Sequence, residues 1–363
     1  MDMKKPRVIA FYLPQFYPTI ENNQWWHKGF TEWTNVGNAK PLFKGHYQPR
    51  VPADLGYYDL RIPEVREEQA NMAKEAGIEG FCYWHYWFAG RRLLDRVFKE
   101  VVETGKPDYP FCLCWANHSW YAKTWEANIP DKLLIEQTYP GEQDYINHFN
   151  AMLPAFKDKR YMKVDGKILF AVYAPLDIPD IKLFISTWND LATQNGLNGF
   201  YFVGFTFQEN NIRSILDAGF DSVVIDYIKE VYGSNSIPIR DFYERFLRKV
   251  FKFPRVRTYE EYTDTVLTNY KCTDNIHPCI LPNFDHSPRS GHRGIILVKN
   301  NPLQWGKFCR TLFSRLNRRH DENLVFIKAW NEWGEGNYLE PDLKFGRKYL
   351  ETLKEALDYV SSL

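Results

Sequence analysis

Eight short apolar runs, most of them followed by an amphipathic segment, restrict the fold of this chain more than any other feature. Runs of this length are typical of strands that are buried on both faces, as in parallel sheets. The runs are Val8–Leu13, Gly80–Trp84, Phe111–Trp115, Ile168–Tyr173, Phe200–Phe205, Ser222–Ile225, Cys279–Phe284 and Leu324–Trp330. The helical patterns are Pro63–Ala76, Leu93–Thr104, Tyr145–Phe156, Ile181–Gln194, Ile212–Ala218, Asp241–Phe251, Pro302–Leu316 and Phe345–Val360. Eight such alternations predict an α/β fold of the (β/α)8 barrel type.

A doubly wound open sheet is the alternative architecture. It requires a glycine-rich phosphate-binding turn after an early strand, whereas Val8–Leu13 is followed by Pro-Gln-Phe-Tyr-Pro. The chain shows no internal repeat and no shift of composition, so we expect residues 1–363 to form a single domain. Two long connections, Pro14–Leu60 and Tyr227–Pro278, should emerge at the C-terminal face of the barrel, where barrel enzymes build their sites.

The composition excludes several classes of partner. The 46 basic and 45 acidic residues nearly cancel, so nothing in the overall charge indicates nucleic acid. The six cysteines form no C-x-x-C pair and no disulfide framework. The start of the chain leads directly into a strand without a signal-peptide region, and no apolar run is long enough to span a bilayer. We therefore expect a soluble cytoplasmic protein that uses no cofactor.

The stretch Leu324–Pro341 is the strongest candidate for a catalytic site. Its apolar run ends in a loop broken by Gly334 and Gly336, and the carboxylates Glu332 and Glu335 fall in that loop. Sugar chemistry uses two carboxyl groups in different environments, one to donate and one to accept a proton. We expect this pair to be catalytic rather than solvated. Glu340 is either a supporting acid or a start signal for the last helix.

Other strand ends carry further candidates. Trp84 and His85 end the second run, and Trp115, Asn117 and His118 end the third; aromatic faces suit the apolar face of a sugar. His85 could equally be a core residue.

The seventh run is followed by Asp285, His286 and Arg289. Asp285 and Arg289 could form a purely structural ion pair. The candidate histidines, His85, His118 and His286, lack the helical spacing of a zinc motif, so we predict no metal site.

Two further segments have an alternative interpretation. Trp33, in the first long loop, could line a substrate groove or plug the barrel mouth. The basic run Arg245–Arg257 is interpreted as a solvated helix face, with an anionic glycan or a membrane surface as the minority interpretation.

Several of these motifs together resemble the WbsX family of polysaccharide-biosynthesis proteins, which is similar to glycoside hydrolase family 99. The resemblance runs nearly end to end. It rests on Ala10–Phe16, Gly29–Trp33, Asp54–Arg61, Gly80–Phe88, Leu113–Asn117, Asn283–Arg289 and Asn331–Glu335 with Glu340–Pro341. The match is specific for the family and much less specific for an activity.

The hydrolase relatives are (β/α)8 enzymes that cleave internal α-mannosidic bonds with retention. The resemblance implies that Glu332 assists the sugar 2-hydroxyl as it attacks the anomeric carbon, and that Glu335 protonates the leaving oxygen. It also implies substrate contacts for Tyr12, Trp33, Trp84, His85, Trp115, Asn117, His118, Asp285, Arg289, Asn331, Trp333 and Glu340. His118 stands where such proteins usually carry an acid.

Three functions remain open at this point: a retaining glycosidase or transglycosidase acting on an α-linked surface polysaccharide, a nucleotide-sugar-dependent glycosyltransferase, and a carbohydrate-binding barrel without activity. The chain has neither an Asp-x-Asp motif nor a glycine-rich nucleotide turn, which disfavours the second. A carbohydrate-binding barrel without activity would not need both Glu332 and Glu335, which disfavours the third. We expect an oligo- or polysaccharide partner, and a lipid-linked precursor at the inner membrane face would reconcile a cytoplasmic enzyme with a surface polymer.

Overall fold

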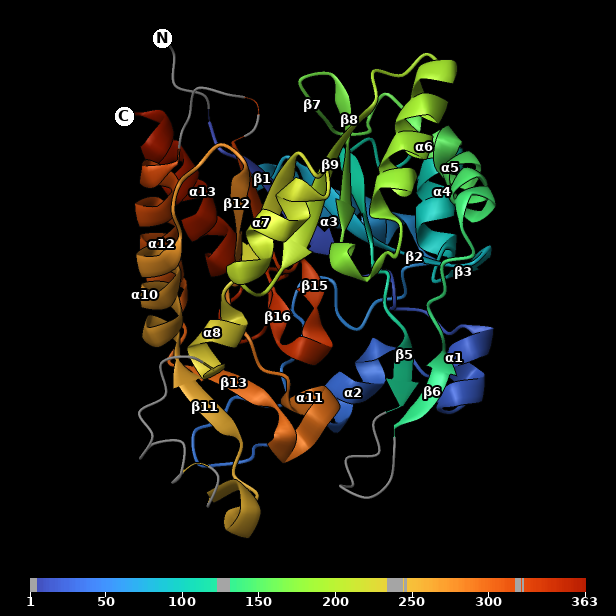
Figure 1. The fold of residues 1–363 in the computed structure, drawn as a ribbon. Helices are drawn as coiled ribbons and strands as arrows, with labels where there is room; N and C mark the ends of the chain where they lie inside the picture. Colours follow the sequence, from blue (N-terminus) through green and yellow to red (C-terminus); the bar gives the residue numbers. More distant parts are fainter. Residues whose placement is uncertain (1–4, 123–130, 234–243, 245–246, 317–320, 322) are drawn as a thin grey trace.

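The computed structural model describes residues 5–122, 131–233, 244, 247–316, 321 and 323–363. Eight parallel strands form a closed barrel with helices around it (Figure 1). The barrel strands are β1 (Arg7–Tyr12), β2 (Gly80–Phe88), β4 (Phe111–Trp115), β8 (Lys167–Val172), β9 (Phe200–Thr206), β10 (Ser222–Asp226), β12 (Ile276–Ile280) and β14 (Leu324–Ile327). The predicted (β/α)8 barrel is confirmed.

The barrel closes through β1, which pairs with both the last and the second barrel strand. Arg7 lies opposite Leu324 of β14, and Ile9 lies opposite Gly80 of β2. Because all eight strands run in the same direction, their carboxyl ends meet at one face of the barrel.

Seven of the predicted helices are present with small shifts of their bounds. They are α3 (Pro63–Glu75), α4 (Arg96–Thr104), α5 (Glu142–Phe156), α6 (Ile181–Gln194), α7 (Asn210–Asp217), α12 (Pro302–Arg315) and α13 (Lys348–Ser361). The predicted helix Asp241–Phe251 lies partly outside the described residues; residues 247–251 of it are helical.

Several predicted bounds were wrong, among them that of the second strand, which runs to Phe88 and not to Trp84. The seventh strand is Ile276–Ile280 and not Cys279–Phe284, because the backbone of Leu281 already bonds to the hydroxyls of Tyr259 and Tyr262 instead of to a strand. The eighth strand was predicted to run to Trp330 but ends at Ile327. The helix predicted as Leu93–Thr104 is α4, which begins at Arg96. Its predicted start was wrong because Arg91–Leu93 forms strand β3, which pairs with the end of β2.

The long connections contain structure that the sequence patterns did not predict. The first holds α1 (Ile20–Trp25) and α2 (Glu32–Asn38), and the later one holds α8 (Ile228–Gly233), β11 (Arg255–Thr258) and α10 (Tyr259–Asn269). The antiparallel strands β5 (Trp120–Ala122) and β6 (Lys132–Ile135) follow β4, whereas α11 (Ser287–Ser290) and β13 (Ile295–Val298) follow β12. Two short pairs complete the fold, β7 (Lys163–Val164) beside β8 and β15 (Asn331–Glu332) with β16 (Asn337–Tyr338). No helix of the described part of the chain is long and apolar enough to cross a bilayer.

The core is unusually rich in aromatic rings, both inside the barrel and under the helices. Inside, Phe11 of β1 stacks on Trp84 with 4.5 Å between ring centroids. Between the barrel and its helices, Trp188 of α6 is fully buried and contacts Phe170 and Phe200 at centroid distances of 4.7 and 5.1 Å. Large buried rings of this kind dominate core energetics and fix how the helix lies on the sheet.

Replacing Trp188 by alanine should therefore destabilise the fold by about 3–5 kcal/mol, since it removes a buried ring and leaves a cavity. Chemical denaturation of the two proteins measures the difference. The exposed Leu303→Ala serves as the matched control and should change stability little. An equal effect of the two substitutions would contradict the packing of α6 on β8 and β9.

Candidate active site

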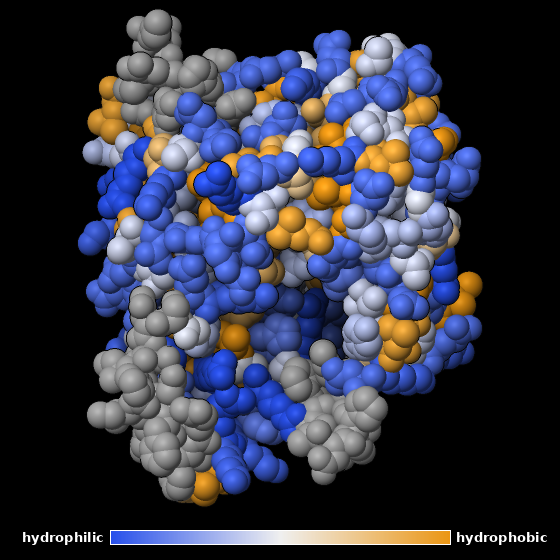
Figure 2. Space-filling model, in the orientation of Figure 1, coloured by the Kyte–Doolittle hydropathy of each residue, from blue (hydrophilic) through white to orange (hydrophobic). Residues whose placement is uncertain are grey.

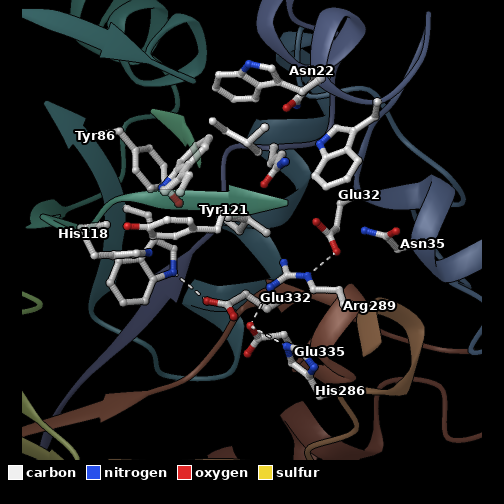
Figure 3. Close-up of a pocket in the computed structure, with 18 of the residues that line it drawn as sticks. Asn22, Glu32, Asn35, Tyr86, His118, Tyr121, His286, Arg289, Glu332 and Glu335 are labelled. Atoms are coloured by element: carbon white, nitrogen blue, oxygen red, sulfur yellow. Dashed lines mark hydrogen bonds and ion pairs between the residues drawn. The ribbon is translucent and has the colours of Figure 1, made fainter. Parts of the chain in front are cut away.

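A cavity of about 660 Å³ opens at the face where the carboxyl ends of the barrel strands meet (Figures 2 and 3). Its walls come from α1 and α2, from the ends of β2, β4, β8 and β14, from the β5–β6 pair, and from α11. Glu332 and Glu335 lie together on its floor, on the segment that follows β14. The prediction that a strand delivers two acids into a loop at this face therefore agrees with the structure.

Two glycines allow the chain to place these acids. A side chain at Gly334 would collide with the Glu32 carboxylate. Gly336 has φ +54°, a left-handed conformation that favours glycine, and a Cβ there would lie 2.8 Å from the Cβ of Asp285. Gly334 lies within the 3₁₀ turn η3 (Trp333–Glu335) and Gly336 directly follows it, so that Glu332 and Glu335 are separated by one short turn.

Glu332 is buried and has one polar protein contact of note, with the indole of Trp84. The Trp84 Nε1–H donates to Glu332 Oε1 at 2.6 Å. Burial, and after it the negative charge of Glu335, raises the pKa of Glu332 to about 7. Glu332 is thus suited to hold a proton near neutral pH.

Glu335 has the opposite environment. Its Oε1 accepts a bond from Arg289 Nη1 at 2.6 Å, and its Oε2 accepts one from Lys328 Nζ at 3.2 Å. Burial acts to raise its pKa, but the positive charges of Lys328 and Arg289 outweigh burial and lower that pKa well below the ordinary value. Glu335 is therefore an anion in the free pocket. The two acids differ in environment as the chemistry requires.

Arg289 also joins Glu335 to a third carboxylate. Its Nε donates to Glu32 Oε1 at 2.9 Å, and Glu32 is 2% exposed at the start of α2. Lys328 lies in turn near Asp226, a fully buried residue at the end of β10. Burial raises the pKa of Asp226 to about 6, although Lys328 opposes that rise. Buried charges are retained in proteins when they are paired in this way.

Aromatic side chains form the wall opposite these charges. Trp25 at the end of α1, Trp26 directly after it, Trp120 and Tyr121 of β5, and Tyr86 of β2 all line the cavity. The rings of Trp25 and Trp120 are in edge contact at 5.9 Å. Trp26 is 45% exposed and Tyr121 is 47% exposed, so both keep open surface. Flat apolar surface next to charged groups is the composition that a sugar ring needs.

Six of the candidate residues line the cavity, namely Trp84, His118, His286, Arg289, Glu332 and Glu335. His118 is exposed shortly after the end of β4, with its ring 5.2 Å from that of Tyr173. The alternative of a structural ion pair between Asp285 and Arg289 is not found among the described contacts: Asp285 bonds to His46 Nε2 at 2.8 Å, whereas Arg289 bonds to the glutamates.

Other predicted residues support the floor of the cavity from behind. Trp333 Nε1–H donates to Glu340 Oε2 at 2.6 Å, and Glu340 also accepts bonds from Tyr58 and Gln69. Burial raises the pKa of Glu340 to about 7. The interpretation of Glu340 as a supporting acid agrees with these contacts; the helix-start interpretation was wrong, since α13 begins at Lys348. Asn331 holds the backbone of Leu13 through two bonds.

The remaining predicted residues lie outside the cavity lining. His85 Nε2 lies 2.7 Å from His148 Nε2 in the core, and burial lowers the pKa of His85 to about 3, so its interpretation as a core residue fits. Tyr12 bonds to Gln69, and Trp33 donates to the carbonyl of Tyr58. Trp115 donates a hydrogen bond to the carbonyl of Trp87. The side chain of Asn117 donates to the carbonyl of Ala174 and accepts from the backbone N–H of Ala174.

Sequence reasoning missed Lys328 and Asp226 as site residues and gave Glu32 no role of its own. Lys328 was hidden inside the apolar run Leu324–Trp330, which was interpreted as a single buried strand. A charged residue one position after a buried strand at the C-terminal face of a barrel was the available signal. Asp226 likewise directly follows the predicted strand Ser222–Ile225. The described residues include no group of three or more His, Cys, Asp or Glu placed to hold a metal ion.

The closed barrel, with a pocket of aromatic rings and two differently held glutamates at the face where such barrels build their sites, makes this chain a (β/α)8 protein with a candidate active site. Within that class, the chain belongs to the family described as Glycosyltransferase WbsX, whose family model matches residues 8–353. The predicted resemblance is thereby confirmed.

Comparisons with individual proteins agree with this family. The chain is 35% identical, over 363 residues, to the uncharacterized protein WxcX of Xanthomonas campestris pv. campestris, covering 96% of this chain and 49% of WxcX. It thus spans about half the length of the curated relatives it matches.

Two solved structures share the fold. A glycoside hydrolase-like protein superposes with a TM-score of 0.61 at 13% identity, covering 98% of this chain and 95% of that chain. The GH99 endo-alpha-mannosidase from Bacteroides thetaiotaomicron gives a TM-score of 0.56 at 14% identity, covering 98% of each chain.

The contacts of Lys328 generate a direct test of the site's electrostatics. Lys328→Met removes a positive charge 3.2 Å from Glu335 Oε2, so the pKa of Glu335 should rise toward the ordinary glutamate range. Carbon NMR titration of protein labelled at the glutamate carboxyls measures it, with Glu335→Gln identifying the signal. The exposed Lys344→Met is the charge-matched control. An unchanged Glu335 titration in Lys328→Met would contradict this arrangement.

Proposed function

We propose that this protein is a carbohydrate-active enzyme of surface polysaccharide metabolism that acts on an α-glycosidic bond with retention. Glu332 and Glu335 are the catalytic pair, and the enzyme works as an endo-glycosidase or a transglycosidase. The observation that carries the proposal is the placement of two glutamates in one pocket, the buried Glu332, held so as to keep a proton, and the partly exposed Glu335, held so as to stay charged.

Below about pH 7 the pair in the free pocket would hold a single proton, on Glu332, because the pKa of Glu332 is raised to about 7 and that of Glu335 is lowered well below the ordinary value. The reaction needs the other tautomer, with Glu335 protonated and Glu332 charged. Sugar hydroxyls that bond to Lys328 and Arg289 would weaken the hold of these cations on Glu335 and favour this transfer. The net number of protons in the pair stays the same.

The chemical step then follows from these positions. Glu332 accepts the proton of the sugar 2-hydroxyl as that oxygen bonds to the anomeric carbon. The bond from the anomeric carbon to the leaving oxygen breaks, and Glu335 gives its proton to that oxygen. In the second step water or an acceptor hydroxyl attacks the anomeric carbon, and the bond from that carbon to the 2-oxygen breaks. Glu335 takes the proton of the attacking oxygen, and Glu332 returns its proton to the 2-oxygen. Because each of the two steps inverts the configuration at the anomeric carbon, the overall reaction retains that configuration.

The substrate we propose is an oligo- or polysaccharide, with its rings on the wall formed by α1 and β5. A lipid-linked precursor at the cytoplasmic membrane face would give the enzyme access to a polymer that ends on the cell surface.

A nucleotide-sugar-dependent glycosyltransferase is the second candidate, because the family description is that of a glycosyltransferase. Against it stands the chemistry of the pocket: three carboxylates, Glu32, Glu332 and Glu335, lie where a diphosphate would have to bind. A barrel that only binds glycans would have no use for the two different acids.

Glu335→Gln should lower turnover on the order of 10²- to 10⁴-fold while keeping glycan affinity, because the proton donor is lost and the shape is retained. Glu332→Gln should have a comparable effect. Turnover is measured on oligosaccharides of the source organism's surface polymer, and binding by calorimetry. The control is Glu351→Gln on the exposed face of α13. Full activity of Glu335→Gln would reject its catalytic role.

The same assay separates the two candidate reactions. Mass spectrometry of oligosaccharide length is recorded with and without nucleotide sugars. Shortening or exchange of chains without any nucleotide sugar supports the proposal. Extension that occurs only with a nucleotide sugar identifies a glycosyltransferase instead.

The pH profile tests the single shared proton. Because the pKa of Glu332 is raised to about 7, the pair loses its proton as the pH rises through that value, and kcat/KM should fall. Below pH 7 the single-proton state persists, since the pKa of Glu335 is far lower. Lys328→Met should move the alkaline limb to higher pH. An alkaline limb that stays in place in this variant would contradict the assignment.

A further inference from the structure

Glu32 is a carboxylate of the pocket to which the proposed mechanism gives no role. It begins α2, its side chain contributes to the cavity lining, and it is nevertheless buried. A carboxylate that is taken out of water is unstable unless a cation or several donors face it. Here the Nε of Arg289 donates to Glu32 Oε1 at 2.9 Å. The stability of this buried charge therefore depends on Arg289 of α11.

Arg289 in turn lies between two carboxylates (Figure 3). Its Nε donates to Glu32 Oε1, and its Nη1 donates to Glu335 Oε1 at 2.6 Å. The guanidinium group is flat and rigid, so a partner that holds Nε also sets the direction in which Nη1 donates. A residue of α2 thus sets the position of the cation that faces Glu335.

The backbone between the two catalytic glutamates packs directly against this bridge. A Cβ added at Gly334 would collide with Glu32 Oε1 and would lie 3.1 Å from Arg289 Nε. Glycine leaves room for both groups against the turn η3, which ends at Glu335. Glu32 and Arg289 therefore lie close enough to this turn to control the charge that Glu335 experiences.

The charge of Glu32 matters because the proposed reaction requires Glu335 to take up a proton. Ion pairs with Lys328 and Arg289 hold Glu335 as an anion in the free pocket. A negative charge at the other end of the guanidinium offsets part of the field that Arg289 exerts on Glu335. If Glu32 were neutral, Arg289 would act on Glu335 more strongly, and the protonated form of Glu335 would be harder to reach.

Other titratable groups also act on Glu335. Those in the described part of the chain are His286 directly before α11, Glu332 before η3, Asp226 at the end of β10 and Tyr173 after β8. None of these four forms a described hydrogen bond with Arg289, whereas Glu32 does. Glu32 is therefore the acid that shares this cation with Glu335.

We propose that Glu32 is a positioning residue of the reaction, which holds Arg289 at Nε and offsets part of its charge, so that Glu335 can leave its ion pair and take up the proton that Glu332 holds in the free pocket. The proton passes from one carboxylate to the other, and the net number of protons in the pocket stays the same. This inference rests on the proposed function of the two glutamates. It predicts an effect of charge that a purely structural residue would not have.

Glu32→Gln tests the charge, because the amide keeps the shape and an oxygen that can accept from Arg289. Since the effect concerns the proton transfer and not the binding of substrate, kcat should fall roughly tenfold while KM changes little. Removing a negative charge also favours the ionised form of Glu332, so the alkaline limb of kcat/KM should move to lower pH by roughly half a unit or more. This shift is opposite in sign to that expected for Lys328→Met.

A titration without substrate separates this inference from the proposed function. In Lys328→Met the pKa of Glu335 should rise toward the ordinary range, and adding Glu32→Gln to that variant should lower the pKa again. Carbon NMR of labelled glutamate carboxyls measures both values. An unchanged Glu335 titration in the double variant would overturn the inference and leave the proposed function intact. Full activity of Glu335→Gln would reject the proposed function whatever this titration shows.

Glu79→Gln is the matched control. Glu79 also accepts a hydrogen bond from an arginine Nε, that of Arg7 at 2.9 Å, but it directly precedes β2 and so lies at the opposite end of the barrel. This variant should keep the kcat and the alkaline limb of the unaltered protein. An alkaline limb that stays in place in Glu32→Gln, or that moves equally in Glu79→Gln, would overturn the inference.

Glu32→Asp provides a second, independent variant, since it keeps the charge and draws the carboxylate back from Arg289 by one methylene. Its alkaline limb should stay in place, whereas kcat should fall because Arg289 is held less firmly. Circular dichroism checks that each variant is folded. If Glu32→Gln does not fold, Glu32→Asp decides: an unchanged kcat would overturn the inference, and a lower kcat at unchanged KM would support it.

Discussion

The pairing of β1 with both β14 and β2 is the interaction on which the rest of the structure depends. This strand joins the first and last parts of the chain, and without it the sheet would stay open between β2 and β14. Closure brings the carboxyl ends of all eight strands into one ring, so that residues distant in sequence become neighbours. Glu32, Arg289 and Glu335 meet in this way, across a separation of 257 residues in the case of Glu32 and Arg289.

Closure alone would place several charges in a dry pocket, where each would be unstable. The structure instead pairs them: Arg289 is shared by Glu32 and Glu335, and Lys328 faces Glu335. Glu332 has no cation within bonding distance among the described contacts, and its partner is the neutral indole of Trp84. Burial, and after it the negative charge of Glu335, raises the pKa of Glu332. The difference between the two glutamates therefore depends on Arg289 of α11 and Trp84 of β2, as well as on Lys328 of the segment that carries both glutamates.

The sequence predicted the parts of this arrangement that depend on local pattern. Apolar runs located all eight barrel strands, and the glycine-broken loop located Glu332 and Glu335. It could not predict which strand-end side chains turn inward, since that depends on register in the closed barrel. His85 and Trp84 are adjacent in one strand, yet Trp84 reaches the cavity and His85 packs against His148. Alternation along a strand made one of them face each way, and the pattern did not say which.

The family's description as a glycosyltransferase and the fold's likeness to hydrolases need not conflict. Both a hydrolase and a transglycosidase make the same first bond change and differ only in what attacks the anomeric carbon afterwards. That choice depends on whether water or an acceptor hydroxyl occupies the space beside Glu335. The indoles of Trp25 and Trp120 lie in contact at the rim of the cavity and cover part of it with apolar surface. In the proposed mechanism, a sugar acceptor stacked on that wall would exclude water from the attacking position, so the aromatic wall of the pocket, rather than its acids, would decide between the two reactions.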